Sequence, residues 1–118
     1  MSEKIIEVIY VSSERMAGLK EICMDMDFEV ICPVPEKPYG GTIHIKYRPR
    51  VETLYTTLVE WNSLQEKLKS IRSESYTAEE LACSIAQDIA SAVDSEEVSV
   101  EVSVNSAFHL PVKVVAQI

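Results

Sequence analysis

The sequence predicts a single α+β domain in which one antiparallel sheet carries two helices on one face, in the chain order ββααββ. Three patterns lead to this prediction. Valine alternates strictly with polar residues over 97–104, which is typical of a half-buried strand. Apolar residues recur at steps of three and four over 51–71, and a helix-capping motif stands at 77–80. Two helices between two strand pairs make a sensible two-layer domain.

The first half of the chain contains the less regular elements. Residues 4–11 are rich in β-branched and aromatic side chains and predict a first, buried strand. Residues 12–27 show weak helical spacing interrupted by Gly18, which indicates a short helix or an irregular excursion. A second strand is predicted at about 42–48, where alternate residues face opposite sides of the sheet, and Pro49 ends it.

Helical spacing dominates the second half. The apolar residues of 51–71 predict one long amphipathic helix. Thr77 and Glu80 then form a capping box, in which the threonine hydroxyl accepts from the amide three residues on and the glutamate reaches back. A second helix is therefore expected at about 78–94. After the valine-rich strand, residues 110–118 predict its partner strand.

Length, composition and charge restrict the functional class. A chain of 118 residues with 47% hydrophobic residues fits one domain over 1–118. The core of such a domain is modest, and oligomerisation would add to its stability. The formal charge of -8 argues against broad nonspecific nucleic-acid binding, which depends on neutralising phosphates. No apolar run approaches the roughly 18 residues that a membrane span needs, and no signal peptide is apparent. A cytoplasmic protein without a membrane partner is expected.

The cysteines point to a nucleophile rather than to a metal site. Cys23, Cys32 and Cys83 do not form a paired metal-binding motif, and two histidines are too few for a convincing catalytic metal centre, so no metal is expected. Cys32 ends an extended segment, and three prolines in the next six residues hold it on a stiff loop. This placement presents the thiol outward, whereas simple packing is the alternative because free cysteine is commonly buried.

The strings around Cys32 carry a resemblance to a known family. Ile-Cys-Pro-Val with a later proline, followed by Thr-Ile-His-Ile-x-Tyr-x-Pro, spans 31–49. This stretch resembles the QueF nitrile reductases and their QueF-like relatives, which act on 7-cyano-7-deazaguanine. The resemblance implies a tunnelling fold (T-fold), whose subunits join their sheets edge to edge into barrels and stack as two rings. It therefore implies a homo-oligomer with active sites between subunits, and exposed sheet edges offer the physical motive.

The resemblance also implies roles for single residues. Cys32 takes the place of the cysteine that adds to the nitrile and forms a thioimide. Glu79 matches the glutamate that grips the guanine-like edge, because a carboxylate accepts from a ring N–H and an amine together. The alternative is a first-turn acid without a ligand. His44, on the polar face of its strand, is a further candidate for substrate binding.

The proton donor departs from the family pattern. Tyr39 stands where the reductases have a catalytic aspartate. A phenol, with an ordinary pKa near 10, could donate a proton, stack on a planar ligand or pack on the loop. Glu36 is an alternative donor. The family histidine before Glu79 is Ala78 in this chain.

The absence of the cofactor segment favours one branch of the family. The reductases carry Glu-Ser-Lys-Ser-Leu-Lys for NADPH, whereas this chain has no lysine over 51–58 and no glycine-rich fingerprint, so no cofactor is expected. The QueF-like relatives lack that segment and make archaeosine in tRNA, with ammonia converting the thioimide to a formamidine. The resemblance therefore implies an amidinotransferase acting on a 7-cyano-7-deazaguanine base, free or in nucleic acid. The alternatives are a divergent NADPH-dependent nitrile reductase, a pterin-type enzyme and a non-catalytic deazaguanine-binding protein.

Overall fold

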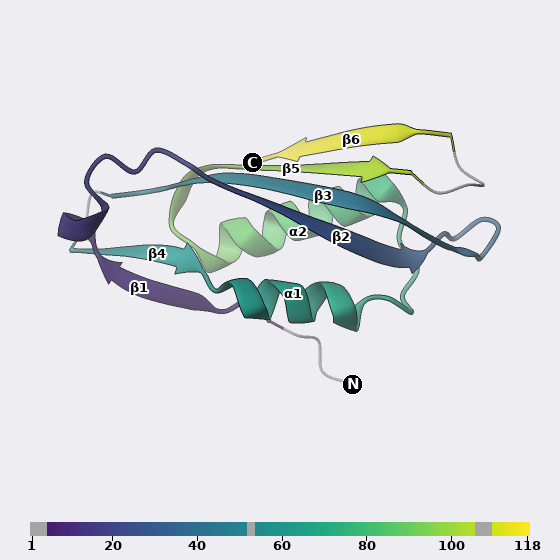
Figure 1. The fold of residues 1–118 in the computed structure, drawn as a ribbon, viewed down its shortest axis with the longest axis horizontal. Coiled ribbons are helices and arrows are strands. Elements are labelled where there is room, and N and C mark those ends of the chain that lie inside the picture. The colour runs from purple at the N-terminus through teal and green to yellow at the C-terminus, as the bar shows by residue number, and fades with distance from the viewer. Residues whose placement is uncertain (1–4, 52–53, 106–109) are drawn as a thin grey trace.

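The computed structural model describes residues 5–51, 54–105 and 110–118. The elements in this part of the chain are β1 (Val8–Ser12), the 3-10 helix η1 (Ser13–Met16), β2 (Ile22–Ile31), β3 (Pro38–Pro49), β4 (Tyr55–Val59), α1 (Trp61–Ser70), α2 (Ala78–Ala92), β5 (Ser95–Val104) and β6 (Val112–Gln117). They form a two-stranded sheet, β1-β4, and a four-stranded sheet in the order β2-β3-β5-β6, and all pairs are antiparallel (Figure 1).

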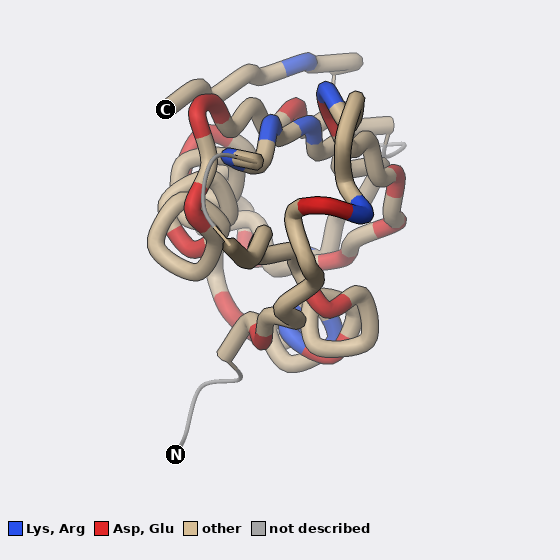
Figure 2. The backbone as a smooth tube through the Cα atoms, turned by 90° about the vertical axis from the view of Figure 1, so that its left-hand side faces the viewer, with Lys and Arg blue, Asp and Glu red and all other residues tan. Residues whose placement is uncertain are grey.

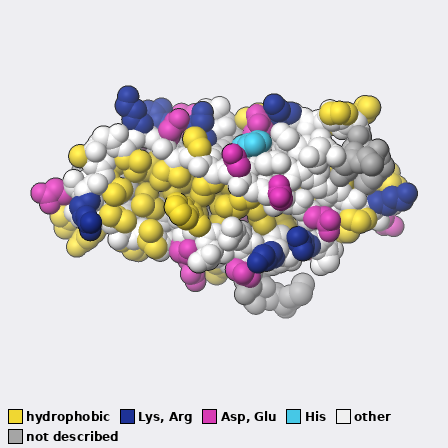
Figure 3. Space-filling view, viewed as in Figure 1, with side chains coloured by type: hydrophobic (Ala, Val, Ile, Leu, Met, Phe, Trp, Pro, Cys, Tyr) yellow, Lys and Arg dark blue, Asp and Glu magenta, His cyan; other side chains and the backbone are white. Residues whose placement is uncertain are grey.

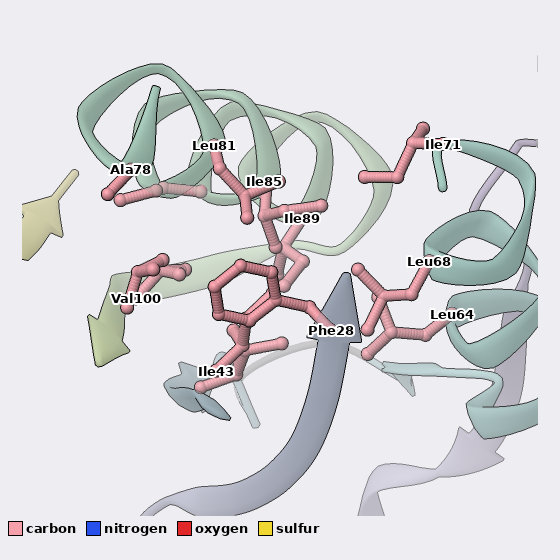
Figure 4. Packing of buried hydrophobic residues seen from close by; sticks show 14 of the residues in the cluster. Phe28, Ile43, Leu64, Leu68, Ile71, Ala78, Leu81, Ile85, Ile89 and Val100 are labelled. Carbon is pink, nitrogen blue, oxygen red and sulfur yellow. The ribbon is translucent and has the colours of Figure 1, made fainter. Parts of the chain in front are cut away.

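Both helices cover one face of the four-stranded sheet. Helix α2 packs across β5 and β6, while α1 lies beside β2. Figure 4 shows Phe28, Ile43 and Val100 of the sheet pointing toward the apolar side chains of the helices. The alternate valines of β5 are all buried, and so are Leu81, Ile85 and Ile89 on one stripe of α2. Burial of such aliphatic groups is the main stabilising term of a domain of this size.

From Thr77 onward, the predicted order is confirmed. The hydroxyl of Thr77 accepts a hydrogen bond from the Glu80 amide at 3.0 Å, and the Glu80 carboxylate accepts one from the Thr77 amide at 3.0 Å. Donation to the Glu80 carboxylate from the Thr77 amide, and then from the Thr77 side chain, lowers the pKa of Glu80. Strands β5 and β6 pair over 95–104 and 112–117, close to the predicted strands. The core order β2-β3-α1-α2-β5-β6 is thus ββααββ.

The first strand is present, but its predicted burial and pairing were wrong, since no residue of β1 is buried. Residues 8–12 do form a strand, but it pairs with β4 in the small sheet rather than with β3. The partner of β3 is β2, which lies largely in the segment that we expected to be helical or irregular. The reason is a period of two: from Ile22 to Val30, apolar residues alternate with Cys23 and three acidic residues. Methionine at two of the apolar positions, together with its strong helix propensity, obscures this pattern.

The single long helix over 51–71 was also wrong. Strand β4 occupies the first part of that range, and α1 begins only at Trp61. The Glu60 side chain caps the helix, accepting hydrogen bonds from the amides of Asn62 at 2.8 Å and Ser63 at 2.9 Å. The β-branched Thr56, Thr57 and Val59 favour the strand, but its partner β1 is distant in sequence, so local spacing alone suggested a helix.

An ion pair joins the two helices beside the core. Lys67 of α1 is buried, and its Nζ lies 3.5 Å from a carboxylate oxygen of Asp88 in α2. Neither helix in the described part of the chain has the length and apolar content that crossing a bilayer requires.

Candidate functional site

A pocket of about 210 Å³ lies at the end of the sheet where α2 begins. The end of β2, the start of β3, the end of β5 and the start of β6 all lie at this end of the molecule, on the right in Figure 1. The pocket is lined by Cys32, Tyr39, Thr77, Ala78, Glu79, Val104 and Val112. Three of the four predicted site residues therefore share one cavity.

Main-chain hydrogen bonds bring the cysteine and the helix together. The Ile31 amide donates to the Glu74 carbonyl at 2.9 Å, and the Tyr76 amide donates to the Ile31 carbonyl at 2.9 Å. These bonds form a parallel bridge between Ile31 and Ser75. Because Cys32 directly follows Ile31 and α2 begins shortly after Tyr76, the bridge sets the thiol beside the first turn of the helix.

The proline-rich loop had led us to expect an outward-facing thiol at Cys32. In the structure this residue is buried. The residue is 8% exposed, yet it lines the pocket. Its Sγ–H donates to the Val34 carbonyl at 2.7 Å, and its amide donates to the Lys37 carbonyl at 2.8 Å. Cys23 and Cys83 are exposed. The thiol is thus held in one place at the wall of a small cavity.

Glu79 presents an available carboxylate to the pocket. It is an exposed residue in the first turn of α2, and among the described residues it makes no hydrogen bond or ion pair. Its neighbour Glu80 differs, since that carboxylate is engaged in the capping box. The Glu79 oxygens therefore remain able to accept hydrogen bonds from a ligand. Two such oxygens suit a planar ligand that carries two N–H donors on one edge.

Tyr39 is a buried wall of the pocket. Its hydroxyl donates to the Tyr76 carbonyl at 2.7 Å, and its ring meets Phe28 edge to face with centroids 5.9 Å apart. Burial, together with the nearby charges of Cys32, Glu79 and Glu80, raises the pKa of Tyr39 to about 12. A phenol with a raised pKa is a weaker acid than an ordinary tyrosine.

The structure does not bring His44 to this pocket. It belongs to a separate cavity of about 280 Å³ on the opposite face of the sheet, where Figure 3 shows a histidine among acidic side chains. Its Nδ1 lies 2.5 Å from the Asp25 carboxylate, and its Nε2 lies 4.0 Å from that of Glu101. These partners occupy the same cross-strand row as His44. Glu36, the alternative donor, does not line the cysteine pocket either.

Basic side chains outside the pocket pair with acidic neighbours. Arg48 pairs with Glu96 and Glu97, and Arg50 pairs with Asp94. Figure 2 shows basic and acidic positions interspersed along the backbone. A further depression of about 560 Å³ lies between β2 and the segment 65–72, and its lining contains no cysteine or histidine. Within the described part of the chain, no group of three or more His, Cys, Asp and Glu side chains is arranged to hold a metal ion.

Sequence reasoning did not identify Thr77, Val104 and Val112 as parts of the site. Each stands at or beside the end of a helix or strand, and such positions converge only when the topology is known. The doublet Gly40-Gly41 could have indicated a close approach of two strands near the pocket. A Cβ at Gly41 would lie 1.8 Å from the Ser103 carbonyl, so only glycine allows β3 to approach β5 so closely near the pocket.

Neither the known protein-family models nor the curated protein sequences contain a match to this chain. Among solved structures, the chain is similar to the archaeosine synthase QueF-Like, crystallised in the apo form. The TM-score is 0.71 and the sequence identity is 22%, over 83% of this chain and 92% of that chain. The chain has the fold of QueF-Like.

This likeness confirms the resemblance at the level of the fold. The QueF-Like fold accounts for the ββααββ core and for two helices on one face of an antiparallel sheet. Within it, the Ile31–Ser75 bridge places Cys32 and Glu79 at the same pocket.

Proposed function

We propose that this chain binds a 7-cyano-7-deazaguanine base in the cysteine pocket and converts the nitrile to a formamidine, in an archaeosine-type modification of tRNA. One observation carries the proposal: Cys32 and Glu79, whose carboxylate has no partner among the described residues, line the same small cavity. The fold supports the proposal, because the archaeosine synthase QueF-Like has the same fold as this chain.

The dimensions of the pocket suit a single flat base. Its volume of about 210 Å³ is below that of pockets for drug-sized ligands, so a sugar attached to the base stays outside. Val104 and Val112 supply apolar surface for the ring, and Tyr39 supplies an aromatic wall. Glu79 accepts hydrogen bonds from the ring N–H and the exocyclic amine of the guanine-like edge. Glu79 lies in the first turn of α2, where the helix dipole interacts favourably with a negative charge.

The chemistry balances without a redox cofactor. The Cys32 sulfur bonds to the nitrile carbon, and the thiol proton ends on the nitrile nitrogen, which gives a covalent thioimide. Ammonia, the nitrogen donor, then adds to the same carbon. The carbon–sulfur bond breaks, the sulfur recovers a proton, and the base leaves as a formamidine. The sum is nitrile plus ammonia, so no hydride and no metal ion enter the balance.

The active assembly in this proposal is a homo-oligomer of stacked rings. Strands β2 and β6 form the two edges of the four-stranded sheet, and such edges invite pairing with another copy. Val34 and Leu110 are each 81% exposed, close in sequence to pocket residues, and Val112 of the pocket is 40% exposed. A second copy at the β6 edge covers this apolar surface and closes the pocket.

A second candidate is a non-catalytic deazaguanine-binding protein. The hydroxyl of Tyr39, at the position of the family's acid, is committed to the Tyr76 carbonyl. Apart from Glu79, no carboxyl group among the described residues lines the pocket. Such a protein binds the base and leaves the nitrile unchanged.

Intact-mass spectrometry after incubation with the free nitrile base tests the proposal. The wild-type protein should gain the mass of the base, Cys32→Ala should not, and Cys83→Ala, which changes an exposed cysteine, should behave as wild type. Addition of ammonium should release the adduct as the formamidine. The same assay on tRNA that carries the nitrile base separates the two substrate forms. Calorimetric binding without any adduct favours the second candidate, and no binding refutes both.

A further inference from the structure

We infer that Tyr39 is a positioning residue, whose hydroxyl holds the segment before α2 and thereby sets Glu79 relative to Cys32. The effect of Tyr39 on ligand binding rests on the proposed function. Its effect on the position of the segment before α2 does not. Tyr39 stands where the reductases of the resembled family have a catalytic aspartate. In this chain we assign that position a structural role in the pocket wall.

The contacts of Tyr39 place it between the two functional side chains. It is the second residue of β3, where it pairs with Val30, and it is 3% exposed. Its hydroxyl reaches the Tyr76 carbonyl at 2.7 Å. Tyr76 directly precedes the helix cap Thr77, so this bond acts on the residue from which the first turn of α2 departs.

The segment 74–77 is therefore held from two directions. The main chain of Ile31 bonds to Glu74 and Tyr76 and fixes the segment against the end of β2. The Tyr39 side chain fixes it against the start of β3. The edge contact with Phe28 keeps the Tyr39 ring from turning away from the carbonyl. A segment held at two strands defines both the height and the tilt of the helix start, and hence the place of the Glu79 carboxylate.

The same geometry disfavours Tyr39 as the proton donor. Its proton lies on the hydrogen bond to the Tyr76 carbonyl rather than on a bond into the cavity. The pKa of about 12, raised by burial and by the surrounding negative charges, keeps the hydroxyl protonated at neutral and moderately alkaline pH. The bond to Tyr76 consequently persists over the whole range in which the protein would work.

Tyr39→Phe tests the inference, because it keeps the ring and its contact with Phe28 and removes only the hydroxyl. In a Cys32→Ala background, which blocks the covalent step, the Kd for the nitrile base should rise about 3- to 10-fold, the effect of one neutral hydrogen bond. Amide exchange at 76–80 should accelerate by a similar factor. With the cysteine present and the base saturating, adduct formation should stay within about threefold of wild type.

The matched control is Tyr47→Phe in the same strand. Tyr47 is also buried, but its hydroxyl accepts from the Val59 amide, away from the pocket. This variant should change neither the Kd nor the exchange at 76–80. Two results overturn the inference: unchanged exchange and affinity in Tyr39→Phe, or a loss of adduct formation at saturating base by the roughly 100-fold or more that removal of a general acid causes. If the wild type binds no base, the proposed function fails, and the exchange measurement alone decides the role of Tyr39.

Discussion

The thiol of Cys32 and the carboxylate of Glu79 line the same pocket, although β3, β4 and α1 separate them along the chain. The bridge between Ile31 and Ser75 makes this possible, because it binds the end of β2 to the segment that leads into α2. The nucleophile and the anchor thus depend on one main-chain contact. Changes at the start of α2 should therefore affect ligand binding as well as stability.

Glu79→Gln should weaken binding of the nitrile base about 10- to 100-fold. The amide replaces one acceptor with a donor, which then faces a donor of the base and leaves it unpaired. Isothermal titration calorimetry in the Cys32→Ala background measures the loss. Glu80→Gln is the control, since glutamine also completes a capping box and the Glu80 side chain is committed to Thr77. Equal affinities for the two variants would contradict the role of Glu79.

Thr77→Ala should lower the free energy of unfolding by about 1 kcal/mol, since it removes the hydroxyl that accepts from the Glu80 amide. Urea denaturation followed by circular dichroism measures the change. Thr57→Ala makes a useful comparison, because its hydroxyl accepts from the Asp94 amide at the other end of α2, far from the pocket. Both variants should be less stable, and only Thr77→Ala should also weaken binding of the base.

Glu80 should make stability depend on pH in the acid range. Its pKa in the folded protein lies below the ordinary value of 4.5, so the folded state binds this proton less readily than the unfolded chain. The stabilisation is therefore present above pH 4.5 and is lost as the pH falls through the lowered pKa. Denaturation of Glu80→Gln and wild type between pH 3 and 7 should show a difference in slope confined to that acid window. A difference concentrated near pH 7 would contradict it.

Asp88→Ala should destabilise the protein more than Lys67→Met. Removing Asp88 leaves the buried ammonium group of Lys67 without its partner, whereas methionine retains most of the apolar stem and removes the charge. Because the Asp88 side chain is 38% exposed, the cost should be roughly 1–2 kcal/mol rather than that of a fully buried pair. Urea denaturation measures it, with Glu66→Ala as the exposed control. A larger loss for Lys67→Met would reverse this account.

Gly41→Ala should destabilise the sheet by about 2 kcal/mol or more, because the new Cβ would lie 1.8 Å from the Ser103 carbonyl and would force β3 away from β5. Thermal unfolding measures the change. Ser103→Ala alters only the side chain at the same contact and should shift stability by less than about 0.5 kcal/mol. A folded Gly41→Ala variant of wild-type stability would show that the strands can separate at little cost.

Local chemistry determined several features without any tertiary information. The capping box at Thr77 and Glu80, the amphipathic stripe of α2 and the alternation of valine in β5 are set by neighbouring residues, and each appears in the structure as predicted. The proline-rich loop after Cys32 also marked the thiol, and its surrounding strings led to a fold that comparison confirms.

Only the tertiary structure decided which strands pair and which site residues meet. Strand β4 formed where spacing favoured a helix, because β1 supplies hydrogen-bond partners from a distant part of the chain. The hydroxyl of Tyr39 bonds to the Tyr76 carbonyl, in a segment that the Ile31–Ser75 bridge brings beside β2. The physical reason is common to both. Hydrogen bonds between segments far apart in sequence decide which groups are buried together, and no local period or propensity records them.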